Sequence, residues 1–130
     1  MTQRLIFGLI AISCMACQPD ETISGYADPA AVYTLTTVND APFDATATIT
    51  FPEEGVARGT GHCNTFQASQ TAPYPWFELG PIAATKRACP DLPLETLFFD
   101  ALTRMTLSEV NGPVLILSNI DDEALVFQSD

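Results

Sequence analysis

Short runs of alternating apolar and polar residues fill most of the chain after residue 30. These runs are rich in β-branched and aromatic residues and are separated by Gly, Pro, Asn and Asp, a pattern typical of strands joined by turns. A glycine-rich bend interrupts the pattern near residue 62, and a proline-broken loop interrupts it near residue 73. The predicted strands cover residues 32–38, 46–51, 56–61, 63–68, 105–110, 114–117 and 124–128, and a further strand starts at residue 76.

One segment has the periodicity of a helix instead. Its apolar residues recur at spacings of three and four, which places them on a single stripe. The members of this stripe are Leu94, Leu97, Phe98, Ala101, Leu102 and Met105. Asp91 is expected to be the N-cap, and Glu95 adds an acid where the helix dipole favours one. Strands, one helix and further strands in this order predict an antiparallel α+β domain.

The two strands that follow the helix are expected to form a hairpin. Asn111 and Gly112 between two apolar runs are a strong hairpin signal. Pro113 follows directly and does not suit a type I′ turn, so a slightly longer loop is predicted.

The first residues follow a different pattern. Residues 5–13 are an apolar run after a single positive charge, and the run ends in small residues and cysteines. This pattern is typical of a secretory signal peptide and is too short to span a bilayer, which needs about 20 apolar residues. Its end resembles the lipobox of bacterial lipoproteins, in which the first residue after cleavage is a lipid-bearing cysteine.

Cys17 is the expected lipidation site, because Ala16 precedes it and cleavage there leaves an even pair of cysteines. Cleavage at Cys14, or conventional cleavage without a lipid, are the alternatives. Gln18 after the anchor favours the outer membrane over the inner membrane. The expected organisation is a signal peptide over residues 1–16, a lipidated cysteine with a flexible tether over 17–30, and one domain over 31–128.

The charge of the chain limits its partners. The 130 residues carry a formal net charge of -11, with 5 basic and 16 acidic side chains. Binding of nucleic acid needs clustered Lys and Arg, so nucleic acid is excluded as a partner. An acidic surface instead attracts cationic partners.

Two motifs carry a family resemblance. The glycine-rich first signature, residues 55–66, ends in a Gly-His-Cys-Asn-Thr-Phe sequence, and the second signature, residues 77–89, ends in Thr85 and Cys89. Together they resemble the META domain, an HslJ-like family of small bacterial envelope proteins. The matching positions are Gly55, Gly59, Gly61, Cys63, Asn64, Phe66, Thr85 and Cys89. The departures are Tyr33 for a common Trp, Asp40 and His62 for a frequent Gly, and Arg87 for a frequent Met.

The resemblance implies a strongly curved antiparallel sheet, a partial barrel, with one main helix packed against it. It also implies an envelope role linked to stress tolerance, and it brings no catalytic activity to carry over. The three glycines are expected to serve turns and close strand approaches, and Asn64 to satisfy backbone groups in the bend.

Since Cys63 and Cys89 lie in the two signatures, the fold would bring them together. A disulfide is then expected in an oxidising compartment, where closing a loop of about 25 residues contributes roughly 3 kcal/mol. Free buried thiols and a reactive cysteine are the alternatives.

The sequence contains no recognisable pattern of metal ligands or catalytic residues. His62 is the only histidine and has no ligands at zinc spacing, and residues 121–123 lack the alternating ligands of a calcium loop. No nucleophile motif or facing pair of carboxylates is recognisable. We therefore expect neither a metal, nor a cofactor, nor enzymatic activity.

Two candidate contact surfaces remain. Arg58, His62, Lys86 and Arg87 would form a basic spot for an anionic group if the two signatures are neighbours. Tyr74 and Trp76 in the proline-rich loop could present aromatic anchors to a partner. The predicted function is a non-catalytic binding module, anchored to the envelope membrane by a lipid and contacting an envelope protein or small ligand. The alternatives are an envelope inhibitor of a cationic attacker such as lysozyme or a protease, and an enzyme with an unrecognised site.

Overall fold

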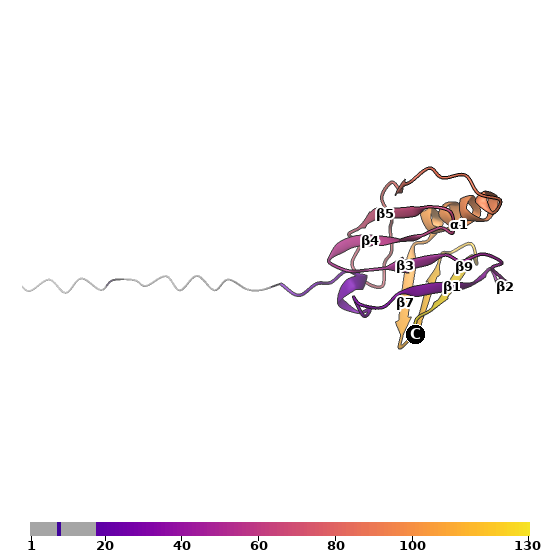
Figure 1. The fold of residues 1–130 in the computed structure, drawn as a ribbon. Coiled ribbons are helices and arrows are strands. Elements are labelled where there is room, and N and C mark those ends of the chain that lie inside the picture. The colour runs from indigo at the N-terminus through magenta and orange to yellow at the C-terminus, as the bar shows by residue number, and fades with distance from the viewer. Residues whose placement is uncertain (1–7, 9–17) are drawn as a thin grey trace, which may run out of the picture.

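The predicted strands form one antiparallel sheet in the computed structural model, which describes residue 8 and residues 18–130. Figure 1 shows this sheet curving strongly, with the helix packed beside it, so the predicted α+β fold is confirmed. The strands are β1 (Tyr33–Val38), β2 (Ala41–Pro42), β3 (Thr48–Thr50), β4 (Gly55–Thr60), β5 (Thr65–Gln70), β6 (Ala83–Ala84), β7 (Leu107–Asn111), β8 (Val114–Ser118) and β9 (Ala124–Gln128).

The sheet has the order β6-β5-β4-β3-β1-β9-β8-β7, and β2 pairs with β1 at the side. It does not close, but the segment 74–79 lies between its two edges. Trp76 bridges Leu107 of β7, and Leu79 bridges Gln70 of β5. The strand predicted from residue 76 is therefore reduced to isolated bridges, and prolines at positions 75 and 81, which lack backbone N–H donors, bound it closely on both sides.

Helix α1 (Leu92–Arg104) lies where the periodicity predicts it, but its buried face is rotated from the predicted stripe. Glu95, Phe98, Ala101 and Leu102 are buried, whereas Leu97 is 45% exposed. The spacing 95, 98, 102 is itself helical, so a buried glutamate replaces the predicted leucine on the inner face. Within the described residues, no helix is long and apolar enough to cross a bilayer.

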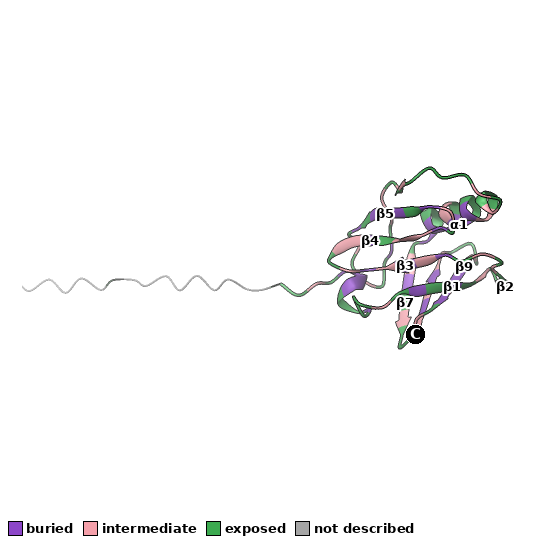
Figure 2. Cartoon of the chain, viewed as in Figure 1, coloured by how far each residue is buried: buried purple, intermediate pink, exposed green. Residues whose placement is uncertain are grey.

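The core lies between the concave face of the sheet and α1 (Figure 2). Alternate residues of the strands point into it, as expected of a sheet with one covered face. The fully buried large side chains are Tyr33, Phe51, Phe77, Phe98, Phe127, Ile23, Ile49, Leu102, Leu115, Leu117, Leu125 and Gln70.

Residues 22–27, which lie within the predicted flexible tether over residues 17–30, pack on the domain in the structure. Residues Ile23–Gly25 form a 3-10 helix, η1, and Ile23 is only 1% exposed within the core. Asp20 holds this turn together by accepting hydrogen bonds from Ser24 Oγ and from Thr22 Oγ1 and N–H. The segment is mostly polar, so its composition did not indicate that Ile23 belongs to the core.

Two hairpin turns depend on left-handed backbone positions. Asn39 and Asp40 have φ of 49° and 66°, so the turn between β1 and β2 has the positive φ values of type I′, which explains the frequent Gly at position 40. The loop between β7 and β8 is not lengthened as predicted. The turn is shifted by one residue, with Gly112 (φ 56°) first and Pro113 second. Pro113 fits there because its position needs a negative φ.

Candidate functional site

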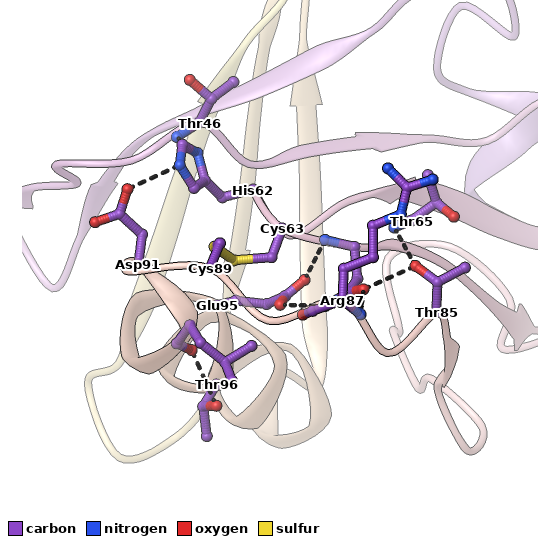
Figure 3. The surroundings of a disulfide bond; sticks show 12 residues. Thr46, His62, Cys63, Thr65, Thr85, Arg87, Cys89, Asp91, Glu95 and Thr96 are labelled. Carbon is purple, nitrogen blue, oxygen red and sulfur yellow. Dashed lines mark hydrogen bonds and ion pairs between the residues drawn. A yellow bond between two sulfur atoms is a disulfide. The ribbon is translucent and has the colours of Figure 1, made fainter.

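A disulfide joins the two signatures at one end of the sheet. Cys63 follows β4, and Cys89 lies three residues before α1. Their sulfurs are bonded, with a Cα–Cα distance of 5.9 Å (Figure 3). The predicted disulfide is confirmed, and it ties the loop 85–91 to the bend after β4.

Asn64 is the polar centre of this region. Its side-chain oxygen accepts hydrogen bonds from the Arg87 N–H (2.6 Å) and from Thr85 Oγ1 (2.9 Å). Its amide nitrogen donates to the Arg87 carbonyl (3.1 Å) and to Glu95 Oε2 (2.8 Å). A buried Asn therefore uses both ends of its amide to connect the first signature, the second signature and the helix. The sequence predicted bonds within the bend, whereas the observed partners are distant along the chain.

Glu95 was predicted only to complement the helix dipole, and its buried contacts with Asn64 were not predicted. It is only 2% exposed, and its other oxygen accepts the backbone N–H of Asn64 at 2.9 Å. Both carboxylate oxygens thus have a hydrogen-bond partner, as a buried acid requires. The helical spacing from Glu95 to Phe98 and Leu102 was the available signal, because it places the acid on the inner face.

The signature glycines leave room for these contacts. A Cβ at Gly61 would lie 2.5 Å from the Glu95 carboxylate and 2.7 Å from the Phe99 ring. A Cβ at Gly59 would lie 2.9 Å from the ring of Phe66 and would overlap the backbone of β3. Gly55 has φ of 78° in the turn that starts β4. The first two glycines serve close approach, and the third serves a turn.

His62 occupies a position at which the family often has Gly, and its φ of 96° explains why. Its Nδ1 accepts the Thr46 N–H at 3.1 Å, so the proton of the neutral ring is on Nε2. Nε2 lies 2.8 Å from Asp91 Oδ2. Asp91 is at the N-cap of α1 as predicted, but its carboxylate binds His62 rather than the helix N–H groups.

The basic residues of the predicted spot lie around one threonine. Three adjoining hollows share Thr85 in their walls, and each contains part of the set. Arg58 lines the first hollow, Lys86 and Arg87 line the second, and His62 and Arg87 line the third. We call Arg58, His62, Lys86 and Arg87 the basic cluster.

The members of the basic cluster differ in their acidic partners. Arg58 lies 3.7 Å from Glu53, and His62 contacts Asp91. Lys86 and Arg87 are exposed and form no salt bridge with any described residue. Two cationic side chains are thus left available beside the Asn64 network.

The aromatic residues Tyr74 and Trp76 do not join this cluster. They lie beside β7, near the other end of β5 from Asn64. Tyr74 is partly buried and stacks on Tyr26 with ring centroids 4.2 Å apart, whereas Trp76 is 59% exposed. The two predicted contact surfaces therefore lie toward opposite ends of the sheet.

The acidic turn at 121–123 is a local structure around Asn119. Asn119 Oδ1 accepts the N–H groups of Asp121 and Glu123, and Glu123 Oε2 lies 2.8 Å from Arg104 Nε. The hydrogen bond from Arg104, aided by that from Asn119, lowers the pKa of Glu123. In the part of the chain that the structure describes, no three His, Cys, Asp or Glu side chains are grouped as metal ligands. Cys17, the predicted lipidation site, lies outside the described residues.

Comparison with known proteins gives a family and a fold. The family model of the META domain matches residues 29–130. The NMR structure of a protein from Burkholderia xenovorans is similar at 19% identity and a TM-score of 0.63, covering 96% of this chain and 99% of that chain. The crystal structure of a DUF4847 family protein from Bacteroides vulgatus is similar at 12% identity and a TM-score of 0.66, covering 82% and 96%. At these identities the likeness establishes the fold alone. No curated protein matches the sequence.

Proposed function

Because the chain belongs to the META domain family, we propose that it is a non-catalytic binding module of the bacterial cell envelope, linked to envelope stress tolerance. In this proposal the signal peptide is removed, Cys17 carries a lipid, and the domain faces the periplasm from a membrane, with the outer membrane favoured. The disulfide supports export, because disulfides persist in oxidising compartments.

The observation that carries a binding function is the basic cluster. Three of the five Lys and Arg residues in a chain of net charge -11 line neighbouring hollows on one end of the sheet. The disulfide and Asn64 fix the backbone of the loop that bears Lys86 and Arg87. A fixed pair of cations that has no acidic partner in the described part of the chain is suited to an anionic group on a protein or a small ligand.

The test of binding is a crosslinked pull-down of the tagged, lipidated protein from envelope extract, read by mass spectrometry. The triple variant Arg58→Gln, Lys86→Gln, Arg87→Gln should lose the captured partner. Arg104→Gln is the matched control, because it removes one cation away from the basic cluster. A partner retained by the triple variant, or lost equally from the control, would contradict the assignment of this surface.

The net charge favours a second candidate, an inhibitor of a cationic attacker such as lysozyme or a protease. Inhibition of lysozyme that weakens as salt is added would support this candidate. It should persist in the triple variant, because removal of cations leaves the acidic surface intact.

Lipidation has its own test. Radiolabelled fatty acid should be incorporated into the wild-type protein and not into Cys17→Ser. Incorporation into the variant would move the anchor to another residue.

A further inference from the structure

The two ends of the sheet differ in what they offer to a membrane. The start of α1, with the basic cluster beside it, and the η1 turn lie at opposite ends of the molecule (Figure 1). The η1 end carries exposed aromatic side chains, Tyr26 at 55% and Trp76 at 59%. It is also the end at which the described chain continues toward Cys17.

Because residues 20–27 pack on the domain, only a short stretch of chain separates this end from the proposed lipid. The Tyr74 N–H donates to the Glu21 carbonyl at 2.7 Å, which joins the aromatic loop to the start of the domain. Cys17 stands four residues before Glu21, so their Cα atoms are at most about 14 Å apart. A lipid on Cys17 would therefore hold this end of the domain close to the bilayer.

The aromatic side chains at this end come from two segments that meet there. Tyr26 stacks on Tyr74 with an interplanar angle of 18°, and Trp76 follows Tyr74 by two residues, at most about 7 Å in Cα distance. Trp76 also borders a hollow shared with Pro73 and the end of α1. We call Tyr26, Tyr74 and Trp76 the aromatic surface. Tyr and Trp are the residues enriched where a protein meets the interface between water and lipid.

The charged residues at the η1 end decide which lipid headgroups this end can approach. Glu21, Asp28 and Glu78 are exposed beside the aromatic residues in the chain. Three of the four described Lys and Arg residues belong to the basic cluster, and the fourth, Arg104, is paired with Glu123. Acidic neighbours oppose anionic headgroups, so a zwitterionic surface fits this end.

We propose that the aromatic surface lies in the headgroup region of a zwitterionic bilayer, which orients the domain with the basic cluster pointing away from the membrane. This inference rests on the proposed lipid anchor at Cys17. It explains how a domain held close to the membrane can still bind a partner, because the basic cluster stays accessible at the end away from the bilayer.

Trp76 is the only tryptophan in the chain, so its fluorescence reports on this surface directly. The lipidated protein is reconstituted into phosphatidylcholine vesicles, with bromine on the acyl chains either near the headgroup or near the bilayer centre. We expect the emission of Trp76 to move to shorter wavelength and to be quenched mainly by the shallow bromines. Phosphatidylglycerol vesicles should reduce the shift at low salt, and added salt should restore it.

A matched control places the reporter at the other end. In the double variant Trp76→Phe, Leu92→Trp, the indole stands on an exposed position at the start of α1, beside the basic cluster, and the bromines should leave it unquenched. Tyr26→Ser keeps Trp76 and should weaken its quenching, because the surface loses one ring.

Three outcomes would overturn the inference. Protein that floats with the vesicles while Trp76 stays in water would contradict the orientation and leave the lipid anchor intact. Protein that does not float would contradict both the anchor and the orientation. A shift of Trp76 emission that grows with protein concentration in the absence of vesicles would assign the aromatic surface to a second copy of the chain.

Discussion

The two ends of the sheet bring distant segments together by different physical means. At the signature end, a disulfide and the amide of Asn64 connect the bend after β4, the loop 85–91 and α1. At the η1 end, one buried isoleucine and a pair of stacked tyrosines hold the first described residues against the segment beside β7. Polar and covalent contacts fix the loop that bears the proposed binding residues. Apolar contacts, together with the backbone hydrogen bond from Tyr74 to Glu21, fix the end that the lipid would anchor.

The two kinds of contact suit different requirements. Directional hydrogen bonds hold the Thr85 hydroxyl and the Arg87 backbone in one geometry, which a binding surface requires. Burial of Ile23 is non-directional, but it is sufficient to keep a short segment on the domain.

Ile23→Ala should have the largest effect. Removing a fully buried isoleucine side chain costs about 3 to 4 kcal/mol of the free energy of unfolding. Denaturant unfolding measures this value. Ile120→Ala is the matched control, because Ile120 is 89% exposed and should change stability by less than about 0.5 kcal/mol. Equal and small effects of both variants would mean that residues 20–27 are the tether that their composition predicted.

Reduction of the disulfide should cost about 3 kcal/mol, the loop-closure entropy for its sequence separation of 26. The effect should also be local. Hydrogen exchange should accelerate at residues 85–91 and stay unchanged at residues 21–27. Equal acceleration at both ends would show that the two ends open as one unit, and the contrast between them would fail.

Asn64→Ala should cost about 2 kcal/mol, because it leaves one oxygen of the buried Glu95 carboxylate without a partner. Glu95→Leu in the same chain should recover part of this loss, since an apolar side chain needs no partner there. Thermal unfolding of the two single variants and the double variant gives the coupling. Additive losses would contradict a shared network.

The sequence predicts the fold well where local patterns decide it. The alternating strands, the position of α1 and the pairing of Cys63 with Cys89, implied by the family resemblance, are all found in the structure. These features follow from the periodicity of apolar residues, from the residues typical of turns and from the two signatures, each of which lies within a short stretch of sequence.

Features that depend on tertiary partners were not predictable in the same way. Ile23 is one apolar residue in a polar segment, and only the core shows that it has a partner. Asn64 selects Arg87 and Glu95, which are 23 and 31 residues away. The basic spot and the aromatic loop looked equivalent in the sequence, and only the sheet register separates them to opposite ends.

His62 provides a finer test of the signature end. His62→Gly and His62→Ala both remove the contacts with Asp91 and Thr46, but only Gly relieves a backbone at φ of 96°. His62→Gly should therefore be more stable than His62→Ala by about 1 kcal/mol. A melting temperature for each variant decides the order. If Ala equals or exceeds Gly, the backbone at this position is not strained.

Asp20 should give the smallest effect, and it acts at the η1 end. Partial burial raises the pKa of its carboxyl group. The hydrogen bonds from Ser24 and Thr22 together lower this pKa by a larger amount, so the net pKa lies below the ordinary value. A lowered native pKa stabilises the fold above the ordinary carboxyl value of about 3.9, and this contribution is lost as pH falls through the native pKa. The difference in unfolding free energy between wild type and Asp20→Asn should therefore shrink as the pH is lowered through that range. Glu54→Gln, in the exposed turn before β4, controls for the loss of one acidic charge. A wild-type advantage that persists unchanged at low pH would mean that the hydrogen bonds to Asp20 do not depend on its ionisation.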